Sequence, residues 1–186
     1  MRTVLIGGIG NVLLGDDAIG PFVVHRLESE YVFGDDVEIV DLGTPSLDLT
    51  QRITGLRAVL LVDCVASRDY APGTVLLFHK QDIPRTLPTE RLDPHSPALS
   101  ECLMAAEMLG ASPQHVLLIG IVGCSFEPGS RLSGPVRMAT RKAIDAALGF
   151  LDQLGIAYEK RPSPVSLPCF AEQLFLAGEN SQSRCG

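Results

Sequence analysis

Two adjacent acids, Asp16 and Asp17, end a glycine-rich loop close to the start of the chain. The loop, residues 8–15, follows a short apolar run at residues 3–6 and precedes a helix predicted over residues 18–31. Loops of this kind usually bind phosphate through backbone N–H groups at a helix N-terminus, but two carboxylates in that position would repel a phosphate. The loop is therefore expected to bind a cation.

Two more residues could join Asp17 in such a site. Asp63 ends an apolar run at residues 58–62, and His95 lies in a long loop before a helix predicted at residues 97–109. In open α/β sheets, ligands bind beyond the carboxyl ends of the strands, so we expect Asp17 and Asp63 to face each other there. His95 would precede a helix N-terminus, whose dipole favours the neutral imidazole that a metal needs. Together the three residues predict a catalytic site for a divalent metal such as nickel or zinc.

The acids of the loop also have a structural interpretation. Asp16 could cap the helix that begins at residue 18, and Asp17 could stabilise its first turn by charge. One cap does not require two acids, so this interpretation does not account for both. Asp16 and Asp41 are also possible helpers in catalysis, because either carboxylate could act as a base.

A nucleotide-binding module is the main alternative function. Asp41 ends the second predicted strand, where a dinucleotide-binding protein places the acid that binds ribose. Against this alternative, Leu13 occupies the position of the third glycine of that fingerprint. A general metallo-aminopeptidase or amidase is a further alternative. Cys64 could be a nucleophile acting with His95, but strand alternation points its side chain away from Asp63.

The remaining pattern predicts the sheet that must position these residues. Strand and helix alternate, which predicts an α/β fold with three layers: a twisted, mostly parallel five-stranded sheet with helices on both faces. The link at residues 66–73 is too short for a helical crossover, so the fourth strand is expected to be antiparallel or at an edge. The predicted strands are residues 3–6, 37–40, 58–62, 74–78 and 115–122, and the predicted helices are residues 18–31, 46–54, 97–109 and 135–154.

Composition limits the classes of protein to consider. The chain has 186 residues, 46% of them hydrophobic, which predicts one domain at residues 1–157 and a polar, proline-containing tail at residues 158–186. The net charge of −7 argues against nucleic acid or an anionic membrane as partner. Without an apolar run of about 18 residues or a signal-type N-terminus, we expect a cytoplasmic protein, and we expect it to be a monomer. The five cysteines form no C-x-x-C pair and are expected to be free thiols.

The motifs follow one another in a recognisable order over about residues 1–150. They are Gly8-Ile9-Gly10-Asn11, Leu13, Gly15-Asp16-Asp17, Gly20-Pro21, Asp41-Leu42-Gly43-Thr44, Leu60-Leu61-Val62-Asp63, His95-Ser96, Gly120-Ile121 and Leu132-Ser133. This succession resembles the hydrogenase maturation endopeptidases. The resemblance implies a twisted, mostly parallel sheet between helices. It also implies a protease that removes the C-terminal extension from the large-subunit precursor of a nickel-iron hydrogenase, after nickel has been inserted.

The resemblance implies the same three site residues as the strand-end argument. The family's metal-binding acid, strand-end aspartate and histidine correspond to Asp17, Asp63 and His95. This chain has Ala18 where many members have glycine, and Cys64 where many have alanine. The metal implied is nickel supplied by the precursor and sensed by the protease, so the site of the isolated protein could be empty or hold another divalent ion.

Overall fold

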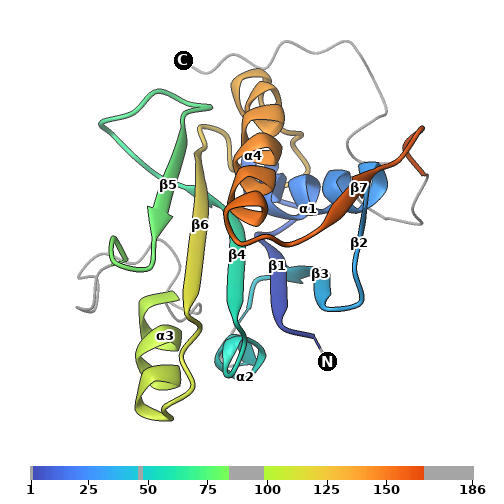
Figure 1. The fold of residues 1–186 in the computed structure, drawn as a ribbon. Coiled ribbons are helices and arrows are strands. Elements are labelled where there is room, and N and C mark those ends of the chain that lie inside the picture. Colours follow the sequence, from blue (N-terminus) through green and yellow to red (C-terminus); the bar gives the residue numbers. More distant parts are fainter. Residues whose placement is uncertain (1, 46–47, 84–98, 166–186) are drawn as a thin grey trace.

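A five-stranded sheet forms the centre of the computed structural model, which describes residues 2–45, 48–83 and 99–165 (Figure 1). The strand order is β3-β1-β4-β6-β5. Strands β3, β1, β4 and β6 are parallel, and β5 pairs antiparallel with β6 at an edge. The predicted mostly parallel sheet with an antiparallel edge strand is therefore confirmed. The bounds are β1 (Val4–Ile9), β3 (Val37–Gly43), β4 (Ala58–Val65), β5 (Val75–His79) and β6 (His115–Val122).

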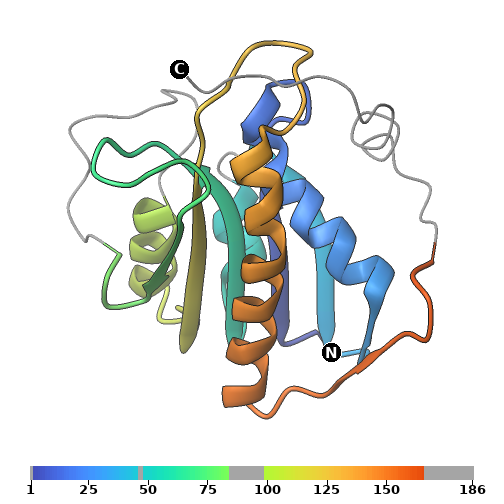
Figure 2. The same ribbon diagram turned by 90° about the horizontal axis from the view of Figure 1, so that it is seen from above.

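Helices cover both faces of the sheet, as predicted. α1 and α4 pack together on one face, and α2 and α3 lie together on the other (Figures 1 and 2). A short 3-10 helix, η1, leads directly into α1. The bounds are η1 (Gly15–Ala18), α1 (Ile19–Glu30), α2 (Asp48–Ile53), α3 (Leu99–Met108) and α4 (Gly134–Gln153). The molecule thus has the three layers expected from alternating strands and helices.

The alternation of side chains along β4 divides the core into two halves. Leu60 and Val62 are buried among the residues of α1 and α4, whereas Leu61 is buried among those of α2 and α3. Cys64 packs against the α1 and α4 half. Because successive side chains of a strand point to opposite faces, Asp63 belongs to the face that α2 and α3 cover.

A second, two-stranded sheet was not predicted from the sequence. β2 (Tyr31–Phe33) follows α1 directly and pairs antiparallel with β7 (Tyr158–Lys160). The rings of Tyr31 and Tyr158 meet edge to face with their centroids 5.8 Å apart, and Phe33 lies beside both. Strands of three residues are too short to show a periodic pattern, so only the tertiary contact reveals them. The first residues of the predicted tail are therefore paired with the domain.

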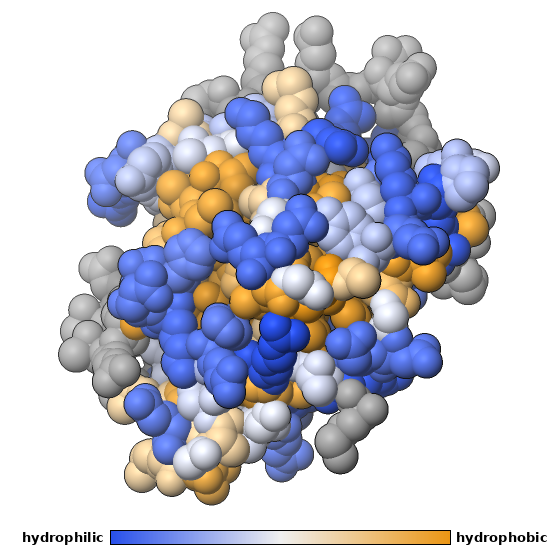
Figure 3. All heavy atoms as spheres, in the orientation of Figure 1, coloured by the Kyte–Doolittle hydropathy of each residue, from blue (hydrophilic) through white to orange (hydrophobic). Residues whose placement is uncertain are grey.

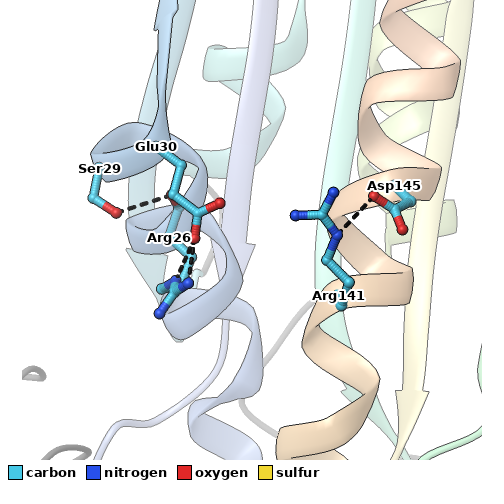
Figure 4. Close-up of polar contacts among 5 residues, drawn as sticks. All are labelled: Arg26, Ser29, Glu30, Arg141 and Asp145. Carbon is cyan, nitrogen blue, oxygen red and sulfur yellow. Dashed lines mark hydrogen bonds and ion pairs between the residues drawn. The ribbon is translucent and has the colours of Figure 1, made fainter. Parts of the chain in front are cut away.

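Local polar contacts link side chains along α1 and α4 (Figure 4). On α1, the Arg26 guanidinium bonds to the Glu30 carboxylate, and Ser29 Oγ donates to the Arg26 carbonyl oxygen at 3.0 Å. On α4, Arg141 Nε lies 3.1 Å from Asp145 Oδ1. Hydrophilic residues are spread over the face shown in Figure 3, with hydrophobic patches between them. Within the described ranges, no helix is both long enough and apolar enough to span a bilayer.

Gly20, in the first turn of α1, allows this helix to approach the ends of β1 and β4. A Cβ atom at Gly20 would overlap the carbonyl oxygens of Ile9 and Val62. Both are backbone atoms of the sheet, so α1 would have to move away. We expect Gly20→Ala to lower the free energy of unfolding by about 3 kcal/mol, measured by urea denaturation.

Gly149, close to the C-terminal end of α4, provides the matched control. A Cβ atom there would meet no heavy atom within 4 Å. Alanine is the better helix former, so Gly149→Ala should raise the free energy of unfolding by up to about 1 kcal/mol. Equal effects of the two substitutions would contradict the close packing of α1 on the sheet.

Candidate active site

Asp17 and Asp63 lie at the same edge of the sheet, where the parallel strands β1 and β4 end. Asp17 belongs to η1, which comes after β1, and Asp63 lies near the end of β4, which pairs in parallel with β1. Asp17 Oδ2 accepts a hydrogen bond from the Asn11 amide at 2.7 Å. Asp63 Oδ1 accepts one from the Cys64 amide at 2.8 Å. Backbone amides therefore orient both carboxylates.

The Asp17 carboxylate is close enough to affect the charge of Asp63. Burial raises the pKa of Asp63 from 3.8 to about 7, and the negative charge of Asp17 contributes to the rise. The hydrogen bond from the Cys64 amide acts in the opposite direction, but it is the weakest of the three effects. A cation between the carboxylates would relieve their repulsion and favour the ionised form of Asp63. The structure thus brings together these two of the three predicted site residues.

Asp16 is fully buried and does not cap a helix. Neither η1 nor α1 has a side-chain cap hydrogen bond, so the alternative interpretation of Asp16 as an N-cap is wrong. The Asp16 carboxylate instead reaches the loop after β6, which lies beside η1 (Figure 2). It accepts hydrogen bonds from the amides of Ser133 (2.6 Å), Cys124 (2.8 Å) and Ser125 (2.9 Å) and from Ser133 Oγ (3.0 Å).

The same loop is also held through the backbone. The Asp16 amide donates to the Ser125 carbonyl oxygen at 2.7 Å, and the Gly129 amide donates to the Leu13 carbonyl oxygen at 2.8 Å. Asp16 and Ser133 are 117 positions apart, so no local pattern in the sequence could have predicted their contact. Residues 123–133 and the loop that carries Asp17 therefore form one connected wall at the sheet edge.

Asp41, the other possible helper, is exposed at this edge. It lies near the end of β3 and is in register with Gly8 of β1. Its Oδ1 accepts a hydrogen bond from the Gly43 amide at 2.8 Å, and Gly43 in turn accepts one from the Gly10 amide at 2.8 Å. Asp41 therefore stands one strand away from the loop that follows β1.

Cys64 is poorly suited to act as a nucleophile. Burial raises the pKa of its thiol, and the charges of Asp17, Asp63 and Asp16 raise it further, in that order. Only the thiolate is reactive, so the acids beside it suppress its reactivity. Cys64 and Cys102 are free, as predicted. The prediction is wrong for Cys124, which is disulfide-bonded, because spacing along the chain does not report on contacts between distant cysteines.

His95, the third predicted site residue, lies outside the described residues, as does the predicted helix start at residues 97–98. Among the residues that the structure does describe, no three His, Cys, Asp or Glu side chains are grouped to hold a metal ion. The described part of the site is thus a pair of interacting carboxylates, Asp17 and Asp63, beside the buried carboxylate of Asp16.

Comparisons with known proteins agree on one family. The family model described as "HycI: Hydrogenase maturation protease" matches residues 21–150. The hydrogenase 2 maturation protease of Escherichia coli (strain K12) is 32% identical over 153 residues, which cover 82% of this chain and 93% of that protein. The hydrogenase expression/formation protein HoxM of Azotobacter vinelandii is 33% identical over 175 residues, covering 88% of this chain and 83% of that protein.

A solved structure agrees with this assignment. The hydrogenase maturating endopeptidase HybD from E. coli matches with a TM-score of 0.79 and 32% identity, covering 87% of this chain and 98% of that chain. The chain belongs to the hydrogenase maturation protease family and is a hydrolase, an endopeptidase.

Proposed function

We propose that this endopeptidase removes the C-terminal extension of the large-subunit precursor of a nickel-iron hydrogenase, and that Asp17, Asp63 and His95 bind the nickel that the precursor carries. The observation that carries the proposal is the interaction between the first two residues: the charge of Asp17 contributes to the raised pKa of Asp63. Two carboxylates held together at a sheet edge are a favourable place for a divalent cation. Family membership favours this function over the nucleotide-binding alternative.

The position of α3 supports His95 as the third ligand. α3 begins at Leu99, four residues after His95, and packs on the face of the sheet to which Asp63 belongs. Because α3 leads into β6, which is parallel to β4, the N-terminus of α3 lies towards the edge where β4 ends. The N-terminus of α3 therefore points to the side of the sheet on which Asp17 and Asp63 lie.

Nickel has the role of a recognition signal in this proposal. Three protein ligands leave coordination positions of a divalent ion open, and cysteine thiolates of the precursor are suitable ligands for them. The nickel would then be bound both by the protease and by the cysteines of the precursor. This bridge would hold the cleavage junction of the precursor beside the site. A precursor without nickel would lack the bridge and would not be positioned for cleavage.

The carboxylates beside the nickel site have different roles in cleavage. Nickel can polarise the scissile carbonyl group and activate a water molecule. Asp16 is fully buried and bound to three amides and a hydroxyl, so we assign it a positioning role in place of a base. Asp41 is exposed at the edge and remains the available carboxylate base.

Substitution of the three ligands tests the proposal. Asp17→Asn, Asp63→Asn and His95→Ala should each lower the rate of precursor processing by about a hundredfold or more. Loss of a residue that merely hydrogen-bonds a metal ligand already lowers activity by about 10–100-fold, and loss of the ligand itself should cost more. Asp145→Asn, on the outer surface of α4, is the matched control and should leave the rate unchanged. The rate is followed by the intact mass of the precursor. Normal cleavage by a variant lacking all three ligands would contradict the proposal, and cleavage of small chromogenic peptides would favour a general peptidase.

A further inference from the structure

Two large apolar side chains are exposed on the wall beside the acid pair. Phe126, in the loop after β6, is 46% exposed, and Leu13, in the loop after β1, is 53% exposed. The backbone joins their two loops, because the Gly129 amide donates to the Leu13 carbonyl oxygen at 2.8 Å. Both side chains therefore belong to the connected wall described above, and neither is needed to fill the core.

The ring of Phe126 lies next to the end of β4. A Cβ atom added at Gly123 would be 2.6 Å from Cys64 Sγ and 2.8 Å from Phe126 Cζ, so the ring tip and the sulfur border the same small space. Cys64 directly follows Asp63 and donates its amide to the Asp63 carboxylate at 2.8 Å. The same Cβ atom would lie 3.2 Å from Asp16 Cβ, and Asp16 directly precedes Asp17 in η1, so the ring borders the element that carries Asp17 and can meet residues flanking a peptide bond held there.

The wall is held in one arrangement before any substrate arrives. The Asp16 carboxylate accepts hydrogen bonds from the amides of residues 124, 125 and 133, and the Asp16 amide donates to the carbonyl oxygen of Ser125. An apolar surface that is already rigid binds a side chain at a lower entropic cost than a mobile loop does. Phe126 thus has the exposure, the location and the rigid support of a binding surface.

We propose that Phe126 is a specificity-determining residue, whose ring binds an apolar side chain of the precursor next to the scissile bond, with Leu13 on the neighbouring loop. This inference rests on the proposed function, because it places the scissile bond at Asp17 and Asp63. Contact with the ring removes apolar surface of both partners from water. The contact is made before and during cleavage alike, so its loss acts on the affinity for the precursor and hardly on the turnover rate.

The test compares Phe126→Ala and Phe126→Leu with the wild type on a nickel-loaded precursor. Phe126→Ala should raise KM about tenfold and change kcat by less than about threefold, whereas Phe126→Leu keeps an apolar side chain and should resemble the wild type. Met138→Ala is the matched control, because Met138 on α4 is also exposed (74%) but lies in a different element. Thermal unfolding of each variant confirms that the fold is kept.

Substitutions in the precursor identify the bound side chain. Alanine at one apolar position next to the cut should raise KM for the wild type and leave KM unchanged for Phe126→Ala. An unchanged KM of Phe126→Ala, or equal sensitivity of both enzymes to every precursor substitution, would overturn the inference while leaving the proposed function intact. A wild-type protein that does not cleave the loaded precursor would contradict the proposed function, and this inference with it.

Discussion

Replacing Asp16 with alanine is expected to lower the free energy of unfolding by about 4 kcal/mol. The buried carboxylate binds the amides of Cys124, Ser125 and Ser133, and alanine would leave these donors without their acceptor. A buried donor without a partner costs about 1–3 kcal/mol, and part of this cost would be recovered by local rearrangement of the loop. Urea denaturation followed by circular dichroism measures the loss.

Two further variants show whether the loss comes from this network. Asp16→Asn keeps one acceptor oxygen but turns an amide group towards backbone donors. This variant should therefore lower the free energy of unfolding by about 2 kcal/mol. Asp145→Asn removes a carboxylate that is 55% exposed and pairs with Arg141 (Figure 4), and its effect should stay below about 0.5 kcal/mol. A loss below about 1 kcal/mol for Asp16→Ala would contradict the role assigned to the network.

Replacing Asp63 with asparagine is expected to have the opposite effect on stability while stopping cleavage. The pKa of Asp63 is raised from 3.8 to about 7 in the folded protein. Between these values the native state binds more protons than the unfolded state, so the free energy of unfolding falls as pH rises through this range. Asparagine cannot ionise, so Asp63→Asn should be more stable than the wild type above pH 7 in the absence of nickel.

The size and pH range of this gain can both be checked. The rise of the pKa corresponds to roughly 4 kcal/mol, and because the side chain is only partly buried, solvent screening should reduce the gain to about 2 kcal/mol. The gain should be complete above pH 7 and should disappear as pH falls to about 4. Urea denaturation at pH 4, 5.5 and 8 tests both statements. A difference independent of pH would show that Asp63 does not titrate as inferred.

The centre of the sheet could be predicted because its strands β1, β4 and β6 are continuous and mostly buried. Residues 58–62 and 116–122 are apolar throughout, as is typical of strands covered on both faces, and they make up most of β4 and β6. The order of the elements then placed the ends of β1 and β4 at one edge, and the structure brings Asp17 and Asp63 together there. This part of the site follows from chain order and strand direction alone.

The rest of the site depends on contacts between distant segments. A helix cap was the local explanation for Asp16, but its partners are in the loop more than a hundred positions away. Phe126 lies in a segment without helix or strand periodicity, and only its position against Gly123 and Cys64 connects it to the site. Local propensity cannot report such contacts, because they form only when the loops meet at the sheet edge.

Under the proposed function, the protein cleaves a precursor only when the precursor carries nickel. The most direct measurement is the intact mass of a purified hydrogenase large-subunit precursor, loaded with nickel or free of it, before and after incubation with this protein. The loaded precursor is expected to lose a C-terminal peptide, and the nickel-free precursor is expected to keep its full mass. Cleavage of both forms at the same rate would contradict the claim that nickel bound at Asp17, Asp63 and His95 is the recognition signal.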